Sequence, residues 1–133
     1  MKEIIESERA PEAIGPYSQA VRAGGLVFTS GQLPLDREGK IVEGGIEKQT
    51  VQALENLKTV IEAAGLTLAE VVRTTVYLQD LKDFGRFNEV YARYFPDKPP
   101  ARACVEVAAL PRSARVEVAA TAAKNEFSAF NFQ

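Results

Sequence analysis

The feature that most constrains the fold is a change of hydrophobic period in the second half of the chain. From residue 71 to 80 apolar and polar residues alternate, which is typical of a strand with one buried face. Aromatic residues then recur every three or four positions until Pro96, which predicts an amphipathic helix. Two more alternating runs follow, at 101–109 and 115–122. This half therefore predicts strand, helix, strand and strand.

The first half predicts an early piece of sheet and one long helix. Two short β-rich runs, 26–30 and 40–42, lie between glycine-bearing turns and predict an antiparallel hairpin or meander. From Ile46 apolar residues recur at helical spacing until Gly65, which predicts a helix of about 17 residues. Because each helix has a single apolar stripe, we expect an α/β (α+β) fold in which both helices pack on one face of one mixed sheet.

Composition bounds the class of protein. A chain of 133 residues, 46% hydrophobic, predicts one globular domain. Its first 15 residues are interrupted by charges and proline, and no apolar run approaches the roughly 18 residues of a membrane span, so we expect neither a secretory signal nor a membrane partner. The single cysteine, Cys104, forms no internal disulfide, which suits a cytoplasmic protein.

Charge and the lack of histidine exclude several functions. A net charge of −2 argues against a large nucleic-acid interface. The chain has no histidine, which removes the usual general base and the nucleophilic triads that depend on it. Scattered carboxylates and one thiol make a poor transition-metal cage, so no metal site is predicted.

Arg102 and Glu117 are the candidate chemical groups. The arginine fork matches a carboxylate, and a glutamate orients or deprotonates water, so the pair suits a small carboxylate substrate. The alternative is a structural ion pair on a sheet face. Strand alternation places Arg102 and Cys104 with Glu117 on the face away from the helices. That face mixes charges with small residues, which predicts a second contact surface formed by oligomerisation.

The spacing of the last two strands bears on this site. If 101–109 and 115–122 pair as a hairpin around the sequence LPRS, Arg102 and Glu117 lie about 16 Å apart along the strands. At that distance, Arg102 and Glu117 of one chain do not both contact a single small substrate. We therefore expect a neighbouring subunit to supply one of the two residues.

Five sequence blocks, in order along nearly the whole chain, resemble the RidA (YjgF-type) family of imine deaminases. They are APEAIGPYSQAV, VFTSGQLPLD, QTVQALENLKTVIEAAG, FNEVYARYF and PARACVEVAALPRSARVEVAATA. The resemblance implies a chorismate-mutase-like fold assembled as a homotrimer with ligand clefts between subunits. It also implies hydrolysis of 2-imino acids and their enamine tautomers, made by pyridoxal-phosphate-dependent dehydratases, to 2-keto acids and ammonia. No metal or organic cofactor is implied.

The resemblance also assigns residues to the site. Arg102 matches the arginine that binds the substrate carboxylate, and Glu117 matches the acid that holds the attacking water. The other matching residues are Tyr17, Ser30, Gly31, Asn88 and Cys104. Each has a structural alternative: a tethered aromatic ring, a strand end entering a turn, a structural hydrogen bond or a small sheet residue.

Two features depart from the family pattern. Ala119 stands where many relatives have a second acid, which puts a paired carboxylate in doubt. The domain ends near residue 124, and the tail NEFSAFNFQ, 125–133, runs past the usual end of the fold. The preferred imine side chain stays open. Two other functions also stay open, an endoribonuclease or translation inhibitor and a non-catalytic trimer that senses keto or amino acids, with Glu117 as the residue that separates sensor from enzyme.

Overall fold

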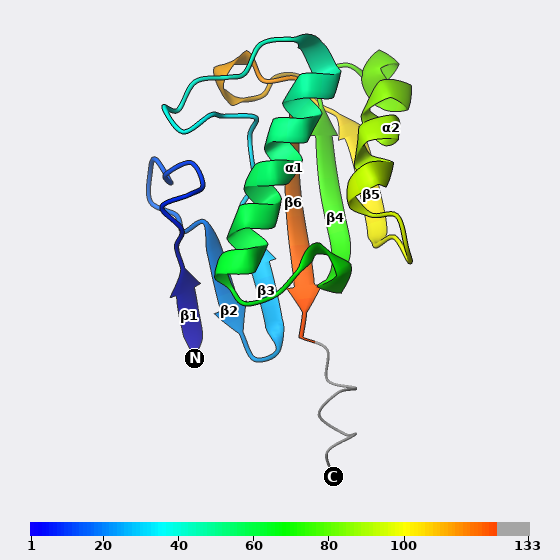
Figure 1. Cartoon of the computed structure of the whole chain (residues 1–133). Helices are drawn as coiled ribbons and strands as arrows, with labels where there is room; N and C mark the ends of the chain where they lie inside the picture. The colour runs from blue at the N-terminus through cyan, green and yellow to red at the C-terminus, as the bar shows by residue number, and fades with distance from the viewer. Residues whose placement is uncertain (125–133) are drawn as a thin grey trace.

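The computed structural model describes residues 1–124, which form one sheet with two helices against one of its faces (Figure 1). The elements are β1 Lys2–Ile5, β2 Ala20–Ala23, β3 Leu26–Thr29, α1 Gly45–Ala63, η1 Leu68–Glu70, β4 Val71–Leu78, η2 Leu81–Asp83, α2 Phe84–Tyr94, β5 Ala101–Glu106, η3 Pro111–Ser113 and β6 Val116–Ala123. The predicted single mixed sheet with both helices on one face is confirmed. No helix in this part of the chain is both long and apolar enough to cross a membrane.

The sheet has the strand order β1-β2-β3-β6-β4-β5. Every neighbouring pair is antiparallel except β4 and β5, which run parallel and are connected through α2. The last strand in the described part of the chain, β6, is therefore central and pairs with both β3 and β4. This arrangement leaves β5 at one edge of the sheet, covered by α2 on the helix side (Figure 1).

Local signals account for the ends of the helices. Gly65 has a φ of 82°, a left-handed conformation that suits glycine, and its N–H donates to the carbonyl of Glu62. The N–H of Leu66 donates to the carbonyl of Ile61, which completes a Schellman motif and ends α1 at the residue that the sequence indicates. Thr67 and Glu70 form the capping box that begins η1.

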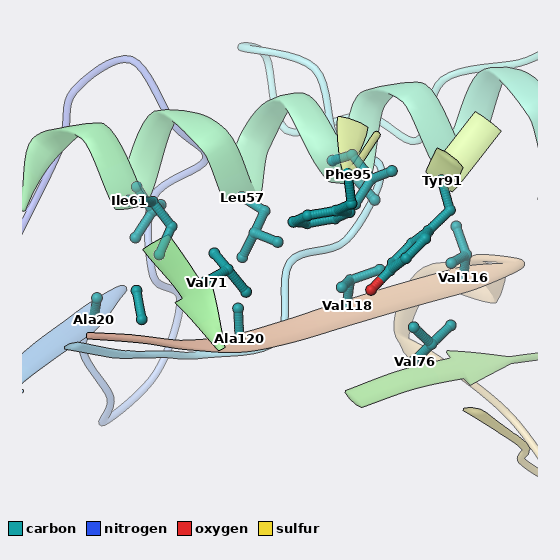
Figure 2. Close-up of a cluster of buried hydrophobic side chains, with 14 of the residues drawn as sticks. Ala20, Leu57, Ile61, Val71, Val76, Tyr91, Phe95, Val116, Val118 and Ala120 are labelled. Carbon is teal, nitrogen blue, oxygen red and sulfur yellow. The ribbon is translucent and has the colours of Figure 1, made fainter. Parts of the chain in front are cut away.

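The hydrophobic core fills the space between the helices and the sheet (Figure 2). Leu57 and Ile61 of α1 face Val118 and Ala120 of β6, and all four side chains are buried. Alternation along β4 is broken near its start, because the register shifts between Val71 and Arg73. This bulge leaves the intervening valine exposed, although simple alternation predicts it to be buried.

The other face of the sheet has no helix, and several of its apolar side chains are exposed. Ile4, Val21 and Phe28 follow one another across β1, β2 and β3 on this face. Tyr77 and Val105 lie side by side farther along, on β4 and β5. Ile4, Phe28 and Val105 are each at least 43% exposed. Exposed apolar side chains are typical of surfaces that oligomers bury, and the second contact surface on this face stays a prediction.

Three predictions about strand pairing and faces are wrong. The early hairpin joins β2 to β3, whereas Ile41 makes only an isolated bridge to Leu35. The last two strands do not form a hairpin, because β4 lies between them. Arg102 and Cys104 do not lie on the face away from the helices: they pair with Thr74 and Val76, whose side chains point toward the helices.

Candidate functional site

Arg102 lies on the helix side of β5 and is held by α2. Its Nη1 donates to Oδ1 of Asn88 at 2.8 Å. The guanidinium carbon is 4.8 Å from the ring centre of Tyr91, 5.4 Å from that of Phe84 and 5.8 Å from that of Phe87. Aromatic rings attract a guanidinium electrostatically and fix the plane of its fork. Among residues 1–124, no carboxylate pairs with Arg102, so the structural ion pair with Glu117 is absent from this part of the chain.

The spacing of α2 explains this arrangement. Positions 84, 87, 88 and 91 follow the steps of three and four that place residues on one helical face. The parallel β4–α2–β5 connection then packs that face over the neighbouring edge strand. The Arg102 side chain is thereby enclosed by residues that are close in sequence to Asn88.

Cys104 lies two residues beyond Arg102 and on the same face of β5. It packs against the hydrophobic core. Burial raises the pKa of the Cys104 thiol, and the nearby Arg102 guanidinium only partly offsets this rise. A thiol with a raised pKa is a poor nucleophile at neutral pH. The side chain therefore packs at the rim of the Arg102 site, and its chemistry gives no reason to assign it a reaction step.

Glu117 belongs to a second cluster, on the helix-free face of β6. Its neighbours Val116 and Val118 are buried toward the helices, so its own side chain points the other way. Burial raises the pKa of the Glu117 carboxyl above its ordinary value of 4.5. Within residues 1–124 no hydrogen bond or ion pair that reaches this carboxylate is found. A half-buried carboxyl without a fixed partner is suited to exchange protons with a bound water.

Gly31 lies directly beside Glu117. A Cβ atom at position 31 would be 2.1 Å from Oε2 of Glu117, so only glycine leaves room for this rotamer. The preceding residue, Ser30, donates its backbone N–H to the carbonyl of Gln19 at 2.8 Å, and its hydroxyl donates to the carbonyl of Ser18. Ser30 is thus anchored by hydrogen bonds to the segment that precedes β2.

Tyr17 belongs to the same N-terminal segment. Its hydroxyl accepts a long hydrogen bond, 3.4 Å, from the N–H of Ile14, and its ring is 53% exposed. Tyr17, Ser18 and Gln19 line a recess on the surface of this segment, to which neither Arg102 nor Glu117 contributes. The alternative interpretation of Tyr17 as a tethered aromatic is therefore right about the hydrogen bond of its hydroxyl and wrong about burial, because the side chain is largely exposed.

The two clusters are far apart within one chain. Arg102 is level with Thr74 of β4, whereas Glu117 is level with Tyr77, three residues farther along. Three residues and two strand spacings separate their Cα atoms by about 14 Å, and the side chains point to opposite faces. The prediction that one chain does not join them is confirmed, although the reason is the intervening strand rather than a long hairpin.

The sequence interpretation missed the residues that enclose Arg102. The helical spacing of the aromatic residues predicts an amphipathic helix, but it does not indicate that Phe84, Phe87 and Tyr91 also surround the arginine of the next strand. The signal was the step of four between Phe84 and Asn88, which places an amide on the aromatic face. Among the residues that the structure describes, no three His, Cys, Asp or Glu side chains lie close enough to hold a metal ion.

Comparison with known proteins identifies the family. The sequence model of the family described as endoribonuclease L-PSP matches residues 7–124. A RutC family protein of Saccharolobus solfataricus is 52% identical over 126 residues, which are 94% of this chain and 100% of the relative. The 2-iminobutanoate/2-iminopropanoate deaminase of Mus musculus is 47% identical over 128 residues, 96% of this chain and 95% of the relative.

A solved structure gives the same result. The crystal structure of E. coli TdcF with bound serine superposes with a TM-score of 0.88 at 42% identity, and the match covers 92% of this chain and 99% of that one. Family model, relatives and structure agree over almost the full described length. The chain belongs to the endoribonuclease L-PSP family, which is the RidA (YjgF-type) family that its five sequence blocks resemble.

Proposed function

We propose that the protein is a 2-iminobutanoate/2-iminopropanoate deaminase that hydrolyses 2-imino acids and their enamine tautomers to 2-keto acids and ammonia. The observation that carries the proposal is the Arg102 guanidinium, which is fixed by Asn88 and three aromatic rings and has no carboxylate partner among residues 1–124. The mouse relative that carries this enzyme's name supports the same reaction.

Arg102 and Glu117 have different roles in the proposed reaction. Arg102 binds the substrate carboxylate through its fork and orients the C=N carbon. Glu117 accepts a proton from water as the water oxygen bonds to the C=N carbon of the protonated imine, which leaves a neutral tetrahedral carbinolamine. Glu117 returns this proton to the amino nitrogen, and the C–N bond breaks as ammonia leaves. The carbinolamine hydroxyl gives its proton to the Glu117 carboxylate as the C=O bond of the 2-keto acid forms. Burial raises the pKa of the Glu117 carboxyl, which makes its carboxylate a stronger base toward the attacking water, and such acid–base assistance contributes about 10²–10⁴-fold.

The remaining candidate residues line the cleft in this proposal. Asn88 fixes Arg102, and Cys104 contacts the ligand through its backbone. Tyr17, Ser30 and Gly31 line the wall opposite Arg102, and Tyr17 or Ser30 assists by hydrogen bonding. We assign the activity to one domain of residues 1–124, without a metal or organic cofactor. The tail, 125–133, lies outside the described residues, and the proposal gives it no catalytic role.

The proposal requires a homotrimer with clefts between subunits. Arg102 and Glu117 point to opposite faces of one chain about 14 Å apart, which is too far for one small imino acid to touch both. A cleft formed by Arg102 of one subunit and Glu117 of the next removes this difficulty. The exposed apolar side chains on the helix-free face supply a surface for the contact. The single cysteine suits a cytoplasmic location.

A coupled assay tests the reaction. Threonine dehydratase generates 2-iminobutanoate from threonine, and semicarbazide traps the imine that this protein has not yet hydrolysed. Wild-type protein should lower the yield of trapped semicarbazone, whereas Arg102→Ala should leave it at the level seen without the protein. Equal trapping with wild type and Arg102→Ala would contradict the proposed function.

Mixing two inactive variants tests the shared cleft. Chains with Arg102→Ala keep Glu117, and chains with Glu117→Ala keep Arg102. Random assembly of equal amounts into cyclic trimers leaves about one quarter of the clefts with both native residues. Activity should rise to about that fraction of the wild-type value after the two variants are unfolded and refolded together. A mixture as inactive as either variant alone would place both residues in one chain's site.

Two alternatives have specific support. The family description names an endoribonuclease, which predicts RNA cleavage that Glu117→Gln abolishes. The E. coli neighbour binds serine, which supports a sensor of small amino or keto acids. A sensor predicts that Glu117→Gln keeps ligand affinity and that wild type leaves semicarbazone trapping unchanged. Cleavage of single-stranded RNA and ligand calorimetry, run with the same two proteins, separate these functions from the deaminase.

A further inference from the structure

Thr74 and Tyr91 lie directly under Arg102, and the proposed function gives neither a role. Thr74 is the Cα partner of Arg102 in the β4–β5 register. The ring centre of Tyr91 is 4.8 Å from the guanidinium carbon of Arg102. The hydroxyl oxygens of Thr74 and Tyr91 are 2.7 Å apart and share a hydrogen bond. Tyr91 therefore connects the other two residues, because its hydroxyl bonds to Thr74 and its ring lies against the Arg102 guanidinium.

Burial makes the hydroxyl pair rigid. Thr74 has no exposed surface and Tyr91 is 6% exposed, so water does not compete for this hydrogen bond. The Tyr91 ring packs against both Phe87 and Phe95, with ring centres 5.4 and 4.7 Å apart. Figure 2 shows the Tyr91 hydroxyl pointing from α2 toward the sheet. The hydrogen bond thus fixes the ring plane on which the guanidinium rests.

We propose that Thr74 and Tyr91 are a positioning pair, which fixes the Arg102 guanidinium in the orientation that binds a carboxylate. The pair acts through Arg102 and does not touch the ligand, so the inference rests on the role that the proposed function gives to Arg102. Asn88 holds one end of the fork and the Tyr91 ring covers one of its faces. Carboxylate binding then loses less side-chain freedom than it would with a mobile arginine.

Three variants separate positioning from packing. Tyr91→Phe keeps the ring and removes its hydroxyl, Thr74→Val removes the partner hydroxyl at nearly constant volume, and the double variant removes both. Each should raise the Kd for 2-oxobutanoate, measured by calorimetry, about three- to tenfold. KM in the coupled assay should rise by the same factor, with kcat changed less than about twofold. Because all three break one interaction, the double variant should bind about as weakly as either single variant.

The double variant shows whether weaker binding in a single variant results from lower stability alone. Tyr91→Phe leaves the Thr74 hydroxyl buried without a partner, which lowers stability, whereas loss of both partners is nearly neutral. The double variant should therefore regain a Tm close to wild type and still bind weakly. A purely structural role predicts the opposite, namely that affinity recovers together with Tm.

Tyr94→Phe is the matched control. It removes a hydroxyl from the same helix, and that hydroxyl donates to Oε2 of Glu55 on α1 at 2.7 Å. No contact between Tyr94 and Arg102 is found among the described residues. This variant should keep the wild-type Kd and KM even if its Tm falls.

The outcomes distinguish the inference from the function beneath it. Unchanged Kd in all three variants, with binding lost in Arg102→Ala, would overturn the positioning pair and leave the proposed function standing. Undiminished binding in Arg102→Ala, or no binding of 2-oxobutanoate to wild type, would overturn the proposed function itself. In that case side-chain NMR tests the positioning pair by itself. A fixed guanidinium gives two separate Arg102 Nη signals in wild type, and these signals should merge in Tyr91→Phe. Identical spectra of the two proteins would refute the positioning pair.

Discussion

Gly31→Ala tests whether the placement of Glu117, rather than its mere presence, controls the reaction. The φ of Gly31 lies outside the left-handed region, so alanine meets no backbone strain at this position. The new Cβ would stand 2.1 Å from Oε2 and 2.9 Å from Cγ of Glu117. Because real Cβ contacts essentially never fall below 3.0 Å, Oε2 must move by at least 0.9 Å, the difference between 3.0 and 2.1 Å.

The expected stability change is small. An off-rotamer side chain costs about 0.5–1.5 kcal/mol. Replacing glycine by alanine without strain stabilises by about 0.4–1 kcal/mol through the unfolded chain. The two effects nearly cancel, so Tm should stay within about 5 °C of wild type. Activity should respond far more, because a displacement of about 1 Å in a catalytic group costs on the order of 100-fold.

The assay measures kcat and KM with dehydratase-generated 2-iminobutanoate, and Tm by circular dichroism. We expect kcat to fall about 100-fold and KM to change less than about threefold, since Arg102 is untouched. Gly85→Ala is the control, because its new Cβ meets nothing within 4 Å and its helical position favours alanine. A Gly31→Ala protein with wild-type kcat would refute the proposed role of Glu117, and a parallel loss of Tm and kcat would assign the effect to folding.

Four further perturbations have definite outcomes. Burial raises the pKa of Glu117, so kcat/KM should fall as the pH drops through this shifted pKa, and the acid limb of the pH profile should lie above pH 4.5. An acid limb at or below pH 4.5 would contradict the proposed role of Glu117. Burial of its charge opposes folding above that pKa, so Glu117→Gln should abolish turnover at pH 7 without lowering Tm. Arg102→Lys keeps the charge and loses the fork, so kcat/KM should fall at least about tenfold, mainly through KM. Asn56→Ala should lower the free energy of unfolding by about 2–3 kcal/mol in urea titrations, because the buried Asn56 amide donates to the carbonyls of Leu33 and Leu35, both at 2.9 Å.

Much of the local structure was predictable because it depends on neighbouring residues. Gly65 ends α1 through its left-handed conformation, and Thr67 with Glu70 begins the next turn, as their spacing indicates. Strand order was not predictable in the same way, because alternation tells which side chains share a face and not which strand lies alongside. Nothing within the β6 sequence itself indicates that it inserts between β3 and β4.

The face of β5 was assigned wrongly for a physical reason. Alternation correctly groups Arg102 with Cys104, but polarity suggested that Val105 points to the core. In the structure Val105 is 45% exposed on the helix-free face, whereas Arg102 packs against aromatic rings on the helix side. A guanidinium tolerates such surroundings because a ring face attracts its charge. The chemistry of Arg102 and Glu117 marks them as candidates and the family resemblance adds the other candidate residues, whereas the division of these residues into two distant clusters required the tertiary structure.

The central place of β6 has a consequence for folding. The strand that joins the two halves of the sheet, β6, is the last strand of residues 1–124 to be synthesised. The edge of β3 away from β2 and the edge of β4 away from β5 therefore stay unpaired until residue 116 and beyond are available. Loop closure over such long sequence separations is slow, which favours folding in milliseconds to seconds rather than microseconds. A nascent or truncated chain that stops before β6 presents two open strand edges and should be prone to aggregate.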